Sequence, residues 1–77
     1  MATPGAAYFA AELRAARGRR NLTQVQLAEL SGISSKTIAR LENAYREARV
    51  GQIIALAKSL GIPARTFLPA PRGRSNK

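Results

Sequence analysis

The chain has 77 residues, with 13 Lys and Arg against 4 Glu and a formal net charge of +9. It contains no His, Cys or Asp, which excludes disulfides, metal sites built on those side chains and histidine-based nucleophilic catalysis. A pair of Glu side chains is the one acid–base option left, and Glu29 and Glu42 fall in separate predicted helices. We therefore expect no enzyme, no metal and no cofactor.

The positive charge predicts a polyanionic partner, and nucleic acid is the obvious one. The alternatives are a basic surface that meets only solvent, or a fragment associated with the ribosome. No apolar run is long enough to span a membrane, and the Arg-rich start lacks the pattern of a cleaved signal peptide. We expect a cytoplasmic protein.

The first predicted helix begins at Ala6, after a short flexible lead at residues 1–5 that contains Pro and Gly. Phe9, Leu13 and Ala16 recur at i, i+4 and i+7, the spacing of one apolar stripe on a helix. Asn21 marks the region where this helix ends.

The next segment, "LTQVQLAELSG", carries signals for both ends of a helix. Thr23 is a candidate N-cap and Gln26, three residues later, completes a capping box. Gly32 suits a left-handed C-cap. The residues expected on the apolar side are Val25, Leu27, Ala28 and Leu30.

A third helix follows almost at once, since Ser34 can cap "SKTIARLE" with Ile38 and Leu41 on its apolar side. Two helices of about two turns joined by so short a link cannot lie antiparallel and must cross steeply. The segment therefore predicts a helix-turn-helix.

The rest of the predicted domain is also helical. An apolar stripe closed by Gly61 indicates a fourth helix, and Pro63 fits the first turn of a last short helix, "PARTFL". Residues 69–77 have no apolar periodicity and predict a disordered basic tail. The prediction is an all-α, five-helix domain over residues 6–68. The stripe of the fourth helix comprises Val50, Ile53, Ile54, Ala57 and Leu60.

From about Leu13 to Leu68 the chain resembles the phage-repressor-like helix-turn-helix proteins, the XRE or Cro/repressor type. The resemblance rests on "LTQVQLAELSGISSKTIARLEN" and on "VGQIIALAKSLGI". It implies a compact five-helix, lambda-repressor-like domain in which the second and third helices form the motif. It also implies a regulator of transcription that binds operator DNA, usually as a dimer.

In this family the second helix of the motif lies in the major groove, which places Ser35, Lys36 and Arg40 toward the bases. The spacing supports this independently, because Lys36 and Arg40 stack at i, i+4 away from the core stripe. Both carry donors only, so guanine O6 and N7 are natural targets. Thr37 is predicted to contact a thymine methyl group or a phosphate. The alternative for Lys36 and Arg40 is that they form a basic face that meets only solvent.

Phosphate contacts are predicted on both sides of the motif. Gln24 opens the second helix, where backbone amides and the helix dipole favour an anion. Asn43 and the loop residues Tyr45, Arg46 and Arg49 are placed by the resemblance against the DNA backbone. The alternatives are that Gln24 reaches only water and that Asn43 is simply a left-handed C-cap.

Two further pairs have predicted structural roles. Arg17 and Glu42 match family positions that tend to form an ion pair between the first and third helices; otherwise they are two solvent-screened charges. Phe67 and Leu68 are possible dimer contacts, the alternative being that they close the core.

The segment after the third helix departs from the family pattern. Ala44 and Ala48 stand where Gly and Pro are usual. Either Ala44 takes a positive φ, at a cost of about 1 kcal/mol, or Asn43 does, or the third helix continues for another turn. Arg49 stands where a Ser-type cap is common, which is unfavourable at a helix start unless an anion docks there.

The sequence thus favours a sequence-specific regulator of double-stranded DNA, most simply a homodimeric repressor in the bacterial nucleoid or a phage-infected cell, with no small-molecule ligand evident. One rival is an antitoxin-type module whose main role is to hold a protein partner. The other is a non-specific nucleic-acid-binding protein, which the shortage of aromatic stacking residues disfavours. The aromatic residues are Tyr8, Phe9, Tyr45 and Phe67.

Overall fold

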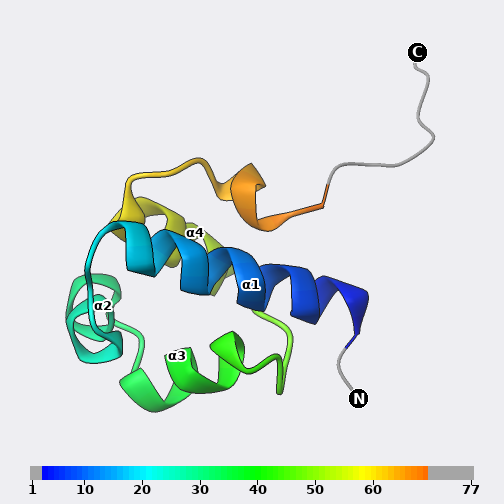
Figure 1. Ribbon diagram of the computed structural model, residues 1–77, viewed down its shortest axis with the longest axis horizontal. Helices are drawn as coiled ribbons and strands as arrows, with labels where there is room; N and C mark the ends of the chain where they lie inside the picture. Colours follow the sequence, from blue (N-terminus) through cyan, green and yellow to red (C-terminus); the bar gives the residue numbers. More distant parts are fainter. Residues whose placement is uncertain (1–2, 70–77) are drawn as a thin grey trace.

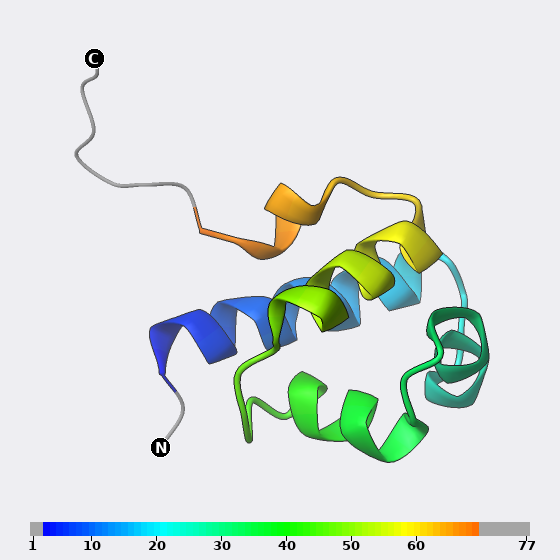
Figure 2. The ribbon, with the colours of Figure 1, turned by 180° about the vertical axis from the view of Figure 1, so that it is seen from behind.

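The computed structural model describes residues 3–69, which form four α-helices and one short 3-10 helix without any strand. The longest helix, α1, runs along the molecule, with α3 on one side of it and η1 on the other (Figure 1). Seen from behind, α4 lies in front of α1 (Figure 2). The elements are α1 (Pro4–Arg19), α2 (Gln24–Ser31), α3 (Ser35–Glu42), α4 (Val50–Leu60) and η1 (Ala64–Phe67).

Helix α1 begins at Pro4 and not at Ala6 as the sequence led us to expect. Thr3 is its N-cap, and the Thr3 hydroxyl accepts a hydrogen bond from the Ala6 amide at 3.0 Å. Proline is well suited to the first helical position, because its missing N–H would have no partner there. Pro4 and Gly5 therefore belong to α1 and not to a flexible lead.

The last predicted helix is also different from the expectation. Pro63 lies just before the element rather than in its first turn, and only Ala64–Phe67 are helical, with 3-10 geometry. Thr66 N–H bonds to the Pro63 carbonyl in the tight i to i+3 pattern. Among the residues described, the domain therefore has four α-helices and a 3-10 turn in place of the five helices that were predicted.

The core lies between α1, α2, α3, α4 and η1. Its fully buried large side chains are Leu13, Leu27, Ile38, Leu41, Leu56, Leu60 and Phe67. Phe67 packs against Phe9 with the rings tilted and their centroids 4.9 Å apart, so it closes the core, which is the alternative role that the sequence left open for it.

Two of the predicted apolar stripes are buried only in part. On α2, Leu27 is buried while Val25 and Leu30 are mostly exposed. On α4, Ala57 and Leu60 are buried as predicted and Leu56 joins them, while Val50 and Ile54 are mostly exposed. A short helix with apolar residues around much of its circumference does not by itself specify which side faces the core.

The helix-turn-helix is formed by α2, α3 and the link between them. Gly32 ends α2 in the left-handed conformation, with φ at 77°. Ser34 then caps α3 by accepting a hydrogen bond from the Thr37 amide at 3.1 Å. None of the helices between residues 3 and 69 is long and apolar enough to cross a membrane. The predicted tail, apart from Pro69, lies outside the described residues.

Candidate nucleic-acid interface

The outward face of α3 carries Lys36 and Arg40, both exposed and separated by four residues, or about one helical turn. Ser35, the first residue of α3, is half-buried. The opposite face buries Ile38 and Leu41 completely, which fixes the rotation of α3 about its axis. Two long cationic donors therefore stand together on a helix that the core holds firmly.

At the start of α3 the hydroxyl of Thr37 is hydrogen-bonded to Ser34, the N-cap residue of the helix. The Ser34 hydroxyl donates to the Thr37 hydroxyl oxygen at 3.0 Å, while Ser34 also accepts from the Thr37 amide. The Thr37 oxygen is thus an acceptor for Ser34, and its own O–H is left to donate. A donor at this position suits a phosphate oxygen or an acceptor on a base edge.

The chain turns after α3 without glycine. Ala44 takes the left-handed conformation with φ at 58°, whereas Asn43 has an ordinary φ of −97°. The Ala44 amide bonds to the Leu41 carbonyl at 3.2 Å and the Tyr45 amide to the Arg40 carbonyl at 3.0 Å, the pattern of a Schellman motif. Of the three possibilities that the sequence left open, Ala44 at positive φ is the one that occurs.

Asn43 contributes to this turn through its side chain. Its amide Nδ2 donates to the Ala39 carbonyl at 2.8 Å, while the residue as a whole stays exposed. Asn43 therefore caps α3 with its side chain rather than by a left-handed backbone.

We call residues 43–49 the clamp loop. Its side chains at Tyr45, Arg46 and Arg49 are all exposed. Arg49 occupies the N-cap position of α4 without supplying a side-chain acceptor; instead, the Gln52 side chain accepts from the Arg49 amide at 2.9 Å. The guanidinium of Arg49 is therefore not used as a cap and remains available to an anion.

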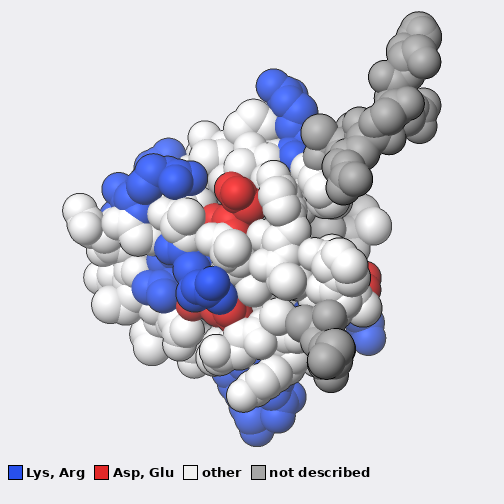
Figure 3. Space-filling model, turned by 45° about the vertical axis from the view of Figure 1, so that its right-hand side comes forward, with Lys and Arg blue, Asp and Glu red and all other residues white. Residues whose placement is uncertain are grey.

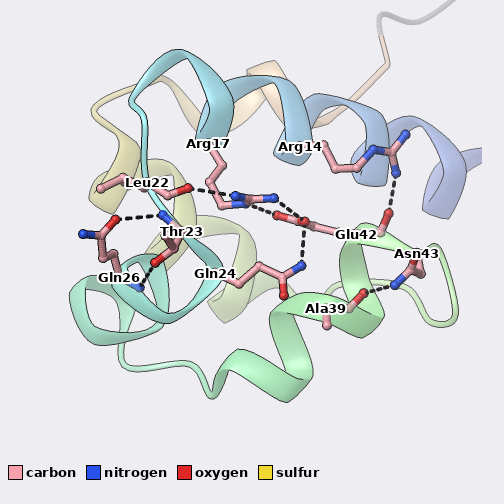
Figure 4. A network of polar contacts seen from close by, with 9 residues as sticks. All are labelled: Arg14, Arg17, Leu22, Thr23, Gln24, Gln26, Ala39, Glu42 and Asn43. Atoms are coloured by element: carbon pink, nitrogen blue, oxygen red, sulfur yellow. Dashed lines mark hydrogen bonds and ion pairs between the residues drawn. The ribbon is translucent and has the colours of Figure 1, made fainter.

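The predicted ion pair between Arg17 and Glu42 is present and joins α1 to α3 (Figure 4). Arg17 Nε donates to Glu42 Oε2 at 2.6 Å and Nη2 to Oε1 at 3.0 Å, a two-point contact with a carboxylate that is almost fully buried. Arg17 Nη1 also donates to the Leu22 carbonyl at 2.8 Å. The hydrogen bond from Glu42 raises the pKa of Arg17, outweighing the opposite effect of burial.

Gln24 is joined to the same carboxylate. Its Nε2 donates to Glu42 Oε1 at 2.9 Å (Figure 4). Since a carboxylate only accepts, the NH₂ end of the Gln24 amide must face Glu42, and one of its two protons is used there. Glu42 thereby ties α1, α2 and α3 together and orients a side chain at the start of α2.

Sequence reasoning missed two contacts around the clamp loop. Arg14, on α1, donates to the Glu42 backbone carbonyl at the end of α3 (Figure 4). Thr3 donates to the Glu47 carboxylate within the loop. Both join residues far apart in sequence, so periodicity could not reveal them; the unused signal for Thr3 was a hydroxyl residue directly before Pro4.

Basic side chains are distributed over the surface in several groups, with acidic side chains between them on the face shown in Figure 3. The positive field therefore extends around much of this side and is not confined to α3. Such a field attracts a polyanion, while the arrangement on α3 and the clamp loop would decide how it docks.

Comparison with known proteins identifies the family of the chain. The model of a helix-turn-helix family matches residues 13–67, most of the chain and all of α2, α3 and α4. The chain belongs to the XRE-type helix-turn-helix family. Members of this family are non-enzymatic regulators, and the chain is a DNA-binding regulator of transcription.

A solved XRE-like structure has a similar fold. The crystal structure of the restriction-modification controller protein C.AhdI from Aeromonas hydrophila aligns with a TM-score of 0.78 and 30% sequence identity. The alignment covers 82% of this chain and 96% of that one. A comparison with curated protein sequences gives no match. The predicted contacts of individual residues with DNA stay predictions.

Proposed function

We propose that this XRE-type regulator is a repressor that occupies a specific operator as a dimer, with α3 in the major groove. The observation that carries the proposal is the pair of exposed cations, Lys36 and Arg40, on the helix that a family member inserts into DNA. Their donors match guanine O6 and N7, and each good contact of this kind discriminates against a wrong base by about 1–3 kcal/mol.

The proposed backbone contacts flank α3. Asn43, Tyr45, Arg46 and Arg49 would hold one phosphate stretch from the clamp loop. Gln24 would hold another at the start of α2, using the amide proton that Glu42 leaves over. With six to eight such contacts, the slope of log affinity against log salt concentration is expected at about −5 to −7.

A dimer is proposed because one reading helix covers too few base pairs for specificity in a genome. Two copies related by two-fold symmetry would read half-sites about 34 Å apart. The apolar side chains available for the contact are exposed: Leu68, together with Val50 and Ile54 on α4. Sedimentation at increasing concentration tests this, and a monomer both free and on DNA would contradict it.

The similarity to C.AhdI supports one particular setting for the regulation. That protein is a restriction-modification controller, so control of a restriction–modification gene set is a candidate role for this chain as well. Such a role would be exercised in the bacterial cytoplasm. Binding of the purified protein upstream of restriction or methylation genes in its own genome would support it.

Selection of bound duplexes from a random pool tests the proposed function as a whole. We expect one recovered motif with two-fold symmetry, containing guanines at the positions under α3, and a half-site spacing of about one helical turn. Equal affinity for random and selected duplexes would instead favour a non-specific binder. Recovery of no duplex, together with a stoichiometric protein partner, would favour the antitoxin-type module.

A further inference from the structure

We propose that Thr3 is a positioning residue for DNA binding, because it holds the one carboxylate of the clamp loop against the start of α1. This inference rests on the proposed function, since it takes the clamp loop to face the DNA backbone. It assigns roles to two residues outside the helix-turn-helix: Thr3, as the holder, and Glu47, as the group that is held.

The contact itself is direct and joins two residues that are far apart in sequence. Thr3 Oγ1 donates to Glu47 Oε2 at 2.6 Å, across 44 positions of sequence. The same Thr3 oxygen accepts from the Ala6 amide at 3.0 Å. The hydroxyl therefore uses its proton for Glu47 and a lone pair for the helix, so one side chain caps α1 and holds the loop.

The electrostatics of α1 explain why a carboxylate is stable at this place. The first turn of α1 contains no acidic residue of its own. The start of a helix carries a partial positive charge that favours an anion. Glu47, brought in from the clamp loop, supplies that anion, and the loop is thereby drawn toward α1.

The position of Glu47 matters because of its neighbours in the loop. It is the only acidic residue of residues 43–49 and lies between Arg46 and Arg49. A carboxylate turned toward a phosphate would repel it and offset the attraction of one adjacent arginine. Held by Thr3, the carboxylate is directed to α1, and the loop offers its cations to the DNA.

The loop also needs such a contact for its shape. It contains neither Gly nor Pro, and its left-handed residue is Ala44, which does not favour that conformation by itself. Contacts with other parts of the chain therefore help to hold the turn, in addition to the local cap that Asn43 supplies. The bond between Thr3 and Glu47 is one of them, and it acts next to the two loop arginines.

The test is a double-mutant cycle in affinity for the duplex selected from the random pool. We expect Thr3→Val to weaken binding about 2- to 5-fold at low salt, the range of a single exposed charge interaction, and less at high salt. In the Glu47→Gln background, the same Thr3→Val change should have no further effect, because a neutral side chain does not repel phosphate. Thr3→Ser keeps the hydroxyl and should bind like the unmodified protein.

The cycle separates this role from simple helix capping, since Thr3→Val removes the cap of α1 in both backgrounds. Equal weakening by Thr3→Val in the unmodified and Glu47→Gln backgrounds, or no weakening in either, would overturn the proposal. If the unmodified protein and Glu47→Gln bind no duplex preferentially, the proposed function itself has failed. If they do bind and the two substitutions act independently, only the role of Thr3 has failed.

Discussion

The two turns that flank α3 are built in different ways. The turn before it uses local signals: Gly32 takes the left-handed conformation and Ser34 caps the next helix. The turn after it, the clamp loop, has no glycine or proline and places Ala44 in the left-handed conformation. The first turn is specified by its own residues, whereas the second combines a local cap from Asn43 with contacts that Thr3 and Arg14 bring from α1 and its N-cap.

The hydrogen bonds at the ends of the helices make the contrast sharper. α1, α3 and α4 all end in the same Schellman pattern of backbone bonds, with Asn21, Ala44 and Gly61 as the left-handed residue. Gly and Asn are the residues that adopt this conformation readily. Among these three ends, only that of α3, beside the proposed DNA contacts, uses a residue that is strained there.

The largest effect is expected from removing the carboxylate that anchors α3. Glu42→Ala leaves Arg17 and Gln24 without their shared acceptor. We expect a loss of about 2–4 kcal/mol in the free energy of unfolding, somewhat less than for a fully buried pair because Arg17 keeps some access to water. Urea unfolding measures it.

The matched control for this change is Glu29→Ala, which removes an exposed carboxylate from α2. It should alter the free energy of unfolding by no more than about 0.5 kcal/mol. Equal effects of the two variants would mean that the contacts of Glu42 do not stabilise the fold.

The second prediction distinguishes base recognition by α3 from phosphate binding by the clamp loop. Arg40→Ala should relax the preference for the base under α3. It should weaken the free energy of binding by about 1–3 kcal/mol for the selected duplex only. Arg46→Ala should weaken all duplexes alike and reduce the salt slope by about 1. Affinities for the selected and scrambled duplexes at several salt concentrations give both numbers. The assignment of α3 to base reading would be wrong if Arg40→Ala lowered every affinity uniformly.

A smaller effect on stability is expected at the turn before α3. Gly32→Ala places a side chain at a φ of 77°, where the new Cβ meets no atom within 4 Å, so only backbone strain is added. We expect a loss of about 1 kcal/mol in the free energy of unfolding. Gly51→Ala, at an ordinary helical position with equally open space, should instead stabilise the protein slightly, and thermal unfolding of both variants checks the pair.

The smallest effect is expected from the converse change in the clamp loop. Ala44→Gly relieves the left-handed strain and should stabilise the protein by about 0.5–1 kcal/mol after the greater freedom of the unfolded chain is counted. Opposite signs for Gly32→Ala and Ala44→Gly would establish that both turns need the same backbone conformation. Destabilisation by Ala44→Gly would show that the loop does not require it.

The sequence revealed the parts of the fold that are encoded locally. Thr23 and Ser34 as caps and Gly32 as the end of α2 could all be predicted, because each acts on its immediate neighbours. The exposed pair Lys36 and Arg40 was predictable too, since helical spacing separates it from the core stripe.

What could not be predicted depends on packing between distant segments. The exposure of Val25 and Leu30 follows from how α2 is rotated against its neighbours, which eight residues of mixed pattern do not determine. The burial of Phe67 follows from its contact with Phe9 on α1. The bond from Thr3 to Glu47 joins the N-cap of α1 to a loop 44 positions later, and no short sequence motif predicts such a contact.

We propose that α3 and the clamp loop together form the DNA-binding surface. Amide chemical-shift changes on titration with the selected duplex test it most directly. We expect the largest changes in residues 34–40 and 43–49, with a smaller group at the start of α2. Changes concentrated on the exposed side of α4 and on η1, with α3 unaffected, would contradict it.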